Sequence, residues 1–155
     1  MKKILIVDWL DKYGGAERVL TVLNKQFDFD KCYTLINIMS NSDLNRVFNG
    51  KKIKIVESNL RLVKSGFRYL FFLFPFFISK FKSDDTNALI ISSSFSVAKG
   101  FKKGGNQTHI CYYQARNQRY IWDTENIYFS WWQKILLAPL LYFCLLYTSD
   151  AADDV

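Results

Sequence analysis

Short apolar runs, each bounded by polar residues, recur along the chain and predict strands. The first run is continuously apolar after its lysine, which is typical of a strand buried on both faces of a parallel sheet. The predicted strands are Lys3–Val7, Cys32–Ile38, Lys52–Val56, Ala88–Ile91 and Thr108–Tyr113. The fourth strand continues directly into the run Ser92–Ser94.

Helical spacing of apolar residues marks two of the stretches between these runs. Residues Ala16–Phe27 form the longer stretch, with an apolar side predicted at Val19, Leu20, Val22, Leu23 and Phe27. The shorter stretch is Asn41–Asn49, with Ser42 as its expected N-cap and an apolar face at Leu44, Val47 and Phe48. Strands that alternate with helical stretches predict an α/β fold with a Rossmann-like, doubly wound parallel sheet.

One domain is expected over residues 1–143, because the chain shows no internal repeat, low-complexity tract or linker. Half of the 155 residues are apolar and 17% are aromatic, which is enough for a core. The net charge is +7, and it rises to +10 over Met1–Phe143, where 21 basic residues face 11 acidic ones. This surplus favours an anionic partner such as a nucleic acid, an acidic membrane or a phosphorylated ligand.

Other features narrow the choice of class. The aromatic residues cluster in apolar runs and not among the basic residues, so we expect no nucleic-acid partner. The chain has three cysteines and a single histidine, His109, which predicts a reducing compartment and no metal site. The apolar run Ile4–Val7 is too short for a signal peptide, so a cytoplasmic location is expected.

The C-terminal residues closely resemble the translation of a transposon-based sequencing adapter. All ten residues of Cys144–Asp153 (Cys-Leu-Leu-Tyr-Thr-Ser-Asp-Ala-Ala-Asp) match it in one frame. The alternative is a natural acidic C-terminus. We expect residues 144–155 to be a non-native tail and the natural domain to continue beyond Phe143. A natural stop codon after Val155 would refute this.

Two polar motifs follow predicted strands. Gly14 and Gly15 stand at a strand-to-helix turn, where backbone N–H groups and the positive helix end suit a phosphate. The alternative is a tight turn without a ligand. Ser93 and Ser94 end the fourth strand, where serines either cap the next helix or line a cleft.

A third motif, Tyr113–Asp123, follows the fifth strand at the same expected sheet edge. Its polar and aromatic residues suit sugar or nucleotide binding, with arginines pairing with phosphates. The candidate substrate-binding residues here are Gln114, Arg116 and Arg119.

Membrane contact is one interpretation of the segment Leu60–Lys82, which carries five basic residues and no acids. Its apolar part, Tyr69–Ile78, has ten residues, about half the length that spans a bilayer. Basic flanks and exposed aromatics suit a helix lying in the membrane interface. The alternative is a helix packed under the sheet. The expected membrane-contact residues are Arg68, Phe71, Phe72, Phe74, Phe76, Phe77 and Lys80.

In order and spacing, four motifs resemble the family-4 glycosyltransferases over nearly all of Met1–Phe143. They are Lys3-Ile-Leu-Ile-Val-Asp8, Gly14-Gly-Ala-Glu-Arg-Val-Leu20, Ile90-Ile-Ser-Ser-Ser-Phe-Ser-Val-Ala-Lys-Gly100, and His109-Ile-Cys-Tyr with Arg119-Tyr-Ile-Trp-Asp123. The resemblance implies the N-terminal, acceptor-side half of a GT-B fold, in which two Rossmann-like domains face each other across a cleft. The second domain would hold most of the nucleotide-sugar donor.

The resemblance also implies roles for individual residues. Gly14 and Gly15 would approach the donor diphosphate, while Ser93, Ser94 and Arg119 would lie near the cleft, and no metal or other cofactor would be needed. The family's sugar-contacting histidine has no counterpart here, because Ala115 or Gln114 occupies its position. No catalytic residue is therefore carried over, and Gln114 or Arg116 would supply different contacts.

The expected full-length enzyme transfers a sugar, with retention, from a nucleotide sugar to a lipid-linked or polysaccharide acceptor. We expect it to be cytoplasmic, with peripheral attachment to an anionic inner membrane face. The present chain alone should be inactive, because it lacks the half that grips the donor. The alternative is a non-catalytic Rossmann-like module that binds a phosphorylated ligand or a partner protein.

Overall fold

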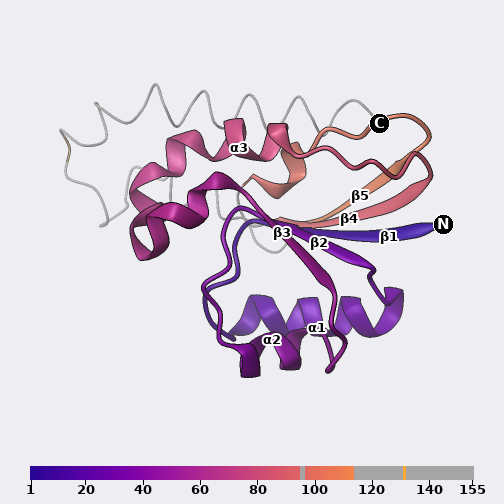
Figure 1. Ribbon diagram of the computed structural model, residues 1–155, viewed down its shortest axis with the longest axis horizontal. Helices are drawn as coiled ribbons and strands as arrows, with labels where there is room; N and C mark the ends of the chain where they lie inside the picture. Colours follow the sequence, from indigo (N-terminus) through magenta and orange to yellow (C-terminus); the bar gives the residue numbers. More distant parts are fainter. Residues whose placement is uncertain (95–96, 114–130, 132–155) are drawn as a thin grey trace.

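A parallel sheet forms the centre of the computed structural model, which describes residues 1–94 and 97–113 together with Trp131. Within this part of the chain the strand order is β3-β2-β1-β4-β5, and every neighbouring pair is parallel. The strands are β1 (Lys2–Val7), β2 (Lys31–Thr34), β3 (Lys54–Glu57), β4 (Ala88–Ser94) and β5 (Thr108–Tyr113). Helices α1 (Gly15–Phe27) and α2 (Asn41–Val47) cover one face, and α3 (Phe74–Lys80) covers the other (Figure 1).

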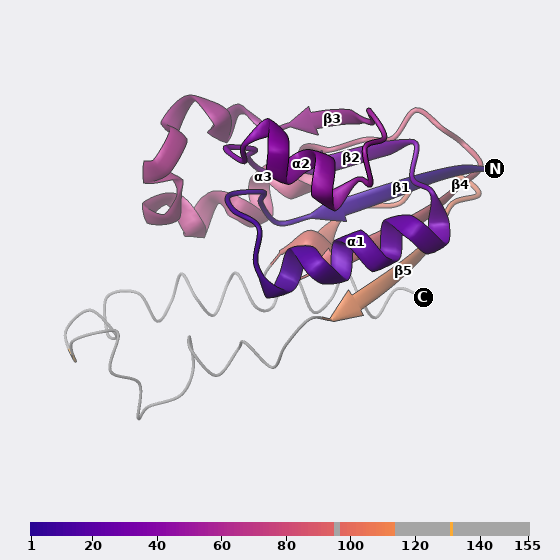
Figure 2. The ribbon, with the colours of Figure 1, turned by 90° about the horizontal axis from the view of Figure 1, so that it is seen from below.

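This arrangement confirms the predicted α/β, Rossmann-like fold. The strand order reverses beside β1, because β2 and β3 extend the sheet on one side and β4 and β5 extend it on the other. Figure 2 shows the arrowheads of β1, β3 and β5 pointing the same way. Loops that follow the strands therefore meet at one carboxyl edge. The topological switch point lies at this edge, where the neighbouring strands β1 and β4 end.

The strand boundaries agree with the sequence to different degrees. The bounds of β5 are those predicted, while β4 extends through Ser94. Strand β2 ends at Thr34, well before the predicted Ile38. The chain after Thr34 still runs beside β1, because Ile38 N–H donates to Leu10 O (2.8 Å) and Leu10 forms an isolated bridge with Asn37.

Helix α1 corrects one position of the predicted apolar side. Leu20 is buried, and Val19, Leu23 and Phe27 are partly buried, but Val22 is 62% exposed. Successive residues turn about 100° around a helix, so Val22 lies roughly opposite Leu20. The helix ends where Asp28 adopts a left-handed conformation with φ 52°.

The N-cap of helix α2 lies two residues before the predicted cap. Its N-cap is Ser40, whose Oγ accepts the Asp43 N–H at 3.2 Å, so Ser42 lies inside the first turn. The same Ser40 hydroxyl also contacts Ser42 Oγ (2.9 Å) and Asp43 Oδ2 (3.0 Å). Val47 and Phe48 are buried, as the apolar face predicted.

The core has two layers, because alternate strand residues point to opposite faces of the sheet. The layer under α1 and α2 includes Leu5, Val7, Leu20, Phe29, Cys32 and Ile91. The opposite layer includes Ile4, Ile6, Ile90, Phe67, Phe74, Ile78 and Phe101. The segment after β3 closes this second layer as a 3-10 helix, η1 (Asn59–Leu73), which continues into α3.

Phe74 corrects part of the expected membrane-contact set. It is only 3% exposed and its ring stacks on Phe67, with centroids 6.1 Å apart. The sheet needs an apolar cover on this face, and Phe74 supplies part of it instead of facing outward. In the part of the chain that is described, no helix has the length and apolarity to cross a membrane.

Candidate functional site

A small pocket lies at the carboxyl edge of the sheet, where the strand order reverses between β1 and β4. Its volume is about 200 Å³, and it opens between the end of β1 and the start of α1. The polar lining residues are Asp8, Glu17 and Ser93, and the apolar ones include Trp9, Ala16 and Leu20. Ligands of doubly wound sheets bind at this position, so this is the candidate site.

Asp8 follows the last residue of β1 and is buried. Its Oδ1 accepts the N–H groups of Val97 (2.7 Å) and Ala98 (2.6 Å). Those groups open the short 3-10 helix η2 (Ala98–Gly100), so the carboxylate caps it. Asp8 therefore joins the end of β1 to η2 and holds its own side chain in the pocket wall.

Glu17 is the third residue of α1 and is also buried. Its Oε2 accepts the Gly14 N–H at 2.8 Å, which is the glutamate half of a capping box. A carboxylate at this helix end is favoured by the helix dipole. The pocket thus has a second negative group, held in place by the glycine turn.

The two glycines of the turn differ in their surroundings. A Cβ on Gly14 would lie 3.2 Å from Glu17 Oε2, while a Cβ on Gly15 would meet nothing within 4 Å. The Gly14 N–H is already occupied by Glu17. Of the two predicted diphosphate-binding residues, Gly15 is the one with open space at its Cβ position.

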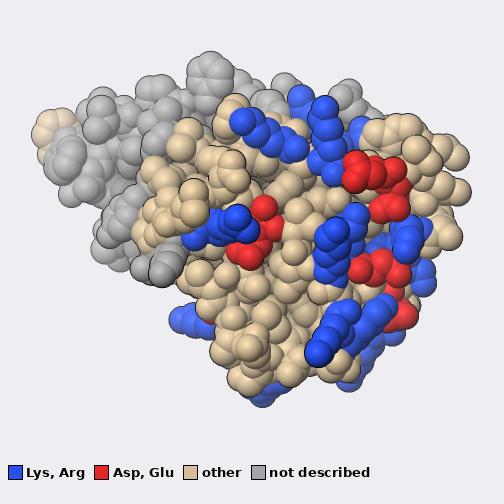
Figure 3. Space-filling model, viewed as in Figure 1, with Lys and Arg blue, Asp and Glu red and all other residues tan. Residues whose placement is uncertain are grey.

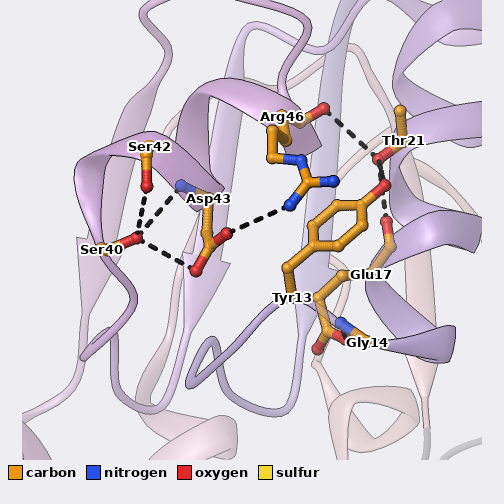
Figure 4. Close-up of polar contacts among 8 residues, drawn as sticks. All are labelled: Tyr13, Gly14, Glu17, Thr21, Ser40, Ser42, Asp43 and Arg46. Atoms are coloured by element: carbon orange, nitrogen blue, oxygen red, sulfur yellow. Dashed lines mark hydrogen bonds and ion pairs between the residues drawn. The ribbon is translucent and has the colours of Figure 1, made fainter.

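Contacts with α2 fix the entry to this turn. Figure 4 shows the Arg46 guanidinium lying over the Tyr13 ring, at 4.4 Å from its centroid, and reaching Asp43 Oδ1 at 3.8 Å. The Thr21 hydroxyl donates to Glu17 O (3.0 Å) and lies 3.5 Å from Tyr13 Oη. The residue before the glycines is therefore held between α1 and α2.

The three serines at the end of β4 have three different roles. Ser93 lines the pocket. Ser94 is buried and its Oγ accepts the Lys99 N–H at 3.3 Å, which is the capping alternative. Ser92 lies on the face of the sheet opposite to Ser93. There a hydrogen bond of 2.9 Å joins its Oγ to His109 Nε2.

Gln114, Arg116 and Arg119 lie outside the described residues. Tyr113, the last residue of β5, ends at the same sheet edge as the pocket because the strands are parallel. Its hydroxyl accepts a hydrogen bond of 3.0 Å from the Nζ of the buried Lys99. The chain that continues from Tyr113 therefore starts at the edge that carries the candidate site.

Burial sets the protonation of one group in β2 and two in β5. It lowers the pKa of His109, with a further lowering from the charge of Lys103. It raises the pKa of the thiols of Cys111 and Cys32, so both are protonated at neutral pH. Over residues 1–94 and 97–113, no three His, Cys, Asp or Glu residues are grouped to hold a metal ion.

The expected membrane-contact residues are distributed over η1 and α3. Phe76 is 52% exposed, and the Lys80 Nζ lies 4.1 Å from its ring centroid. Phe77 is partly buried against the core. The side chains of Arg68, Phe71 and Phe72 lie outside what the structure describes.

Sequence reasoning did not single out Asp8, Trp9 and Glu17 as site residues. A signal for Glu17 is its place three residues after Gly14, which is the spacing of a capping box. A signal for Asp8 is a single acid directly after a buried strand. Trp9 has no such signal, because its position at the pocket depends on packing.

Comparison of the chain with models of known families, with curated proteins and with solved structures gives no match. The fold and the pocket define a Rossmann-like α/β domain with a pocket at its topological switch point. The function must therefore be argued from that pocket.

Proposed function

We propose that this chain is the acceptor-side domain of an enzyme that transfers a sugar from a nucleotide-sugar donor. The observation that carries the proposal is the pocket between β1 and β4, with Asp8, Glu17 and Ser93 in its lining. The resemblance of the glycine turn and of the serine-rich strand end to family-4 glycosyltransferases supports it.

The pocket chemistry suits a neutral ligand rich in hydroxyl groups. Two carboxylates accept hydrogen bonds from hydroxyls, and Ser93 can both donate and accept. The same carboxylates repel an anion, so a phosphate is disfavoured inside the pocket. At about 200 Å³, the pocket is smaller than the roughly 300–1,000 Å³ typical of drug-sized ligands, which suits one sugar ring.

The donor diphosphate belongs outside the pocket, at the open backbone of Gly15. The first N–H groups of α1 lie at this end of the helix and carry the positive end of the helix dipole. They would offset the charge of the departing diphosphate without a metal ion. Glu17 reduces the local positive charge, so the proposal assigns most of the donor contacts to a second α/β domain facing this edge.

The rival function is a non-catalytic module that binds a phosphorylated ligand. The open backbone at Gly15 would serve both functions. The two functions differ in the ligand of the pocket. The enzyme must bind a saccharide beside Asp8, Glu17 and Ser93, whereas the module needs to bind only the phosphorylated ligand, at Gly15.

Ligand titrations of the isotopically labelled chain, followed by NMR of its backbone amides, separate the two. We expect neutral oligosaccharides to shift the signals of Asp8, Glu17 and Ser93, and nucleoside diphosphate sugars to shift those of Gly15 and Ala16. The matched variant is Gly15→Val, whose Cβ meets nothing within 4 Å and whose side chain would occupy the proposed diphosphate position. It should lose the nucleotide response and keep the saccharide response.

Two results would contradict the proposal. One is tight binding of nucleoside diphosphates, with or without a sugar, and no saccharide response at the pocket. The other is sugar transfer by Met1–Val155 alone, because the proposal places most of the donor contacts on a separate domain.

A further inference from the structure

The segment from η1 through α3 carries side-chain charge of one sign only. Residues Asn59–Lys82 hold five basic side chains and no acid. On the face that Figure 3 presents, acidic and basic side chains lie side by side over the rest of the described surface. A segment of one sign attracts a surface of the opposite sign.

The same segment exposes large apolar side chains while its other face is buried. Leu62 is 79% exposed, Val63 41% and Phe76 52%. Four residues on its inner side, Leu60, Phe67, Phe74 and Ile78, are buried in the core under the sheet. The inner face anchors the segment, so the outer apolar residues are not needed to hold the fold together.

Basic and apolar groups are adjacent on this outer face. Arg61 is exposed beside Leu62 in η1, and Lys80 lies over the exposed ring of Phe76 in α3. The Lys80 ammonium lies 4.1 Å from the Phe76 ring centroid, so a cation and an exposed aromatic ring share one place on this surface, as in a membrane interface. Exposed apolar residues and cations together match the acyl boundary and the headgroups of an anionic bilayer.

Contacts through the core connect this face to the candidate site. Trp9 lines the pocket, and its ring packs on Phe67 and Phe74, with centroids 5.8 Å and 6.0 Å apart. Phe67 belongs to η1, and Phe74 begins α3. The inner face of the segment is thus one residue away from the pocket.

We propose that the outer face of η1 and α3 docks on an anionic phospholipid bilayer. In this interface Leu62, Val63 and Phe76 enter the acyl boundary, and Arg61 and Lys80 contact lipid phosphates. The pocket is then held at the lipid surface, where an acceptor carried on a lipid could reach it. The docking itself is independent of the chemistry at the pocket.

Vesicle flotation of the chain Met1–Val155 tests the docking. The vesicles contain phosphatidylcholine with or without phosphatidylglycerol, and no nucleotide or sugar is present. We expect binding only with phosphatidylglycerol, and weaker binding at high salt. Each of Arg61→Gln and Lys80→Gln should weaken binding roughly fivefold. Leu62→Ser and Phe76→Ser should each weaken it about tenfold.

Two variants elsewhere on the surface serve as matched controls. Val22→Ser changes an apolar residue of α1 that is similarly exposed, and Lys52→Gln changes an exposed lysine before β3. Both should bind vesicles like the parent chain. The docking would be disproved by equal binding of all variants, by equal binding to vesicles without phosphatidylglycerol, or by no binding at all. Gly15→Val should also bind normally, so failure of the sugar-transfer proposal leaves this result unaffected.

Discussion

At the scale of single residues, Gly14 and Gly15 are neighbours with opposite requirements. An added Cβ at Gly15 meets open space, so Gly15→Ala should leave stability unchanged or raise it by up to about 1 kcal/mol. An added Cβ at Gly14 crowds Glu17 Oε2 and disturbs the bond to the Gly14 N–H, so Gly14→Ala should cost about 1 kcal/mol. Urea unfolding of both variants measures the difference, and equal midpoints would contradict it.

His109 should make stability depend on pH. Burial lowers its folded pKa below the ordinary value of 6.5, so the unfolded chain takes up the proton first. The stability due to neutral His109 is therefore complete above about pH 6.5 and declines as the pH falls towards the lowered folded pKa. His109→Gln removes this contribution.

The measurement for His109 is the free energy of unfolding of the parent and of His109→Gln across mildly acidic pH. The difference between the two should change with pH in this window, whereas the carboxylates common to both cancel. Parallel curves for the two proteins would show that His109 does not titrate differently on folding.

At the scale of elements, Asp8 joins β1 to η2. Asp8→Ala leaves two buried N–H groups without this acceptor, which should cost about 3 kcal/mol. Asp8→Asn keeps a neutral oxygen of the same shape and should cost about half as much. Thermal or urea unfolding should find the parent most stable, Asp8→Asn less stable and Asp8→Ala least stable. Equal losses for both variants would place the effect in the charge and not in the acceptor.

The sequence predicted elements better than it predicted their ends. Continuous apolar runs located the strands because a strand between two covered faces has few alternatives, and β5 was predicted with its exact bounds. The start of α2 was misplaced because Ser40 and Ser42 are both good caps, and only the backbone at Ser40 turns its hydroxyl towards the Asp43 N–H. Helix spacing included Val22 in the buried side because a short apolar cluster fits several helical faces.

At the scale of the whole molecule, the site was harder to predict than the fold. The glycine turn and the serines were located at the right sheet edge, because parallel strands bring their carboxyl ends together. Which of three serines lines the pocket depends on the pleat of β4, and Ser94 turned out to cap η2. Phe74 was assigned to the surface because composition alone does not tell the inner face of an aromatic helix from the outer one.

Phe67 of η1 is a core residue that also packs against Trp9 in the pocket wall. It is fully buried, and its ring contacts both Trp9 and Phe74. Phe67→Ala should lower the free energy of unfolding by about 3–5 kcal/mol, because the sheet and its cover relax only partly around the cavity. Leu62→Ala, in the same helix but on its outer face, should change it by less than about 0.5 kcal/mol.

Because Trp9 loses a neighbour, a milder Phe67→Leu should still weaken the saccharide response at Ser93 while the chain stays folded. An unaltered response in that folded variant would show that the packing under Trp9 does not shape the pocket.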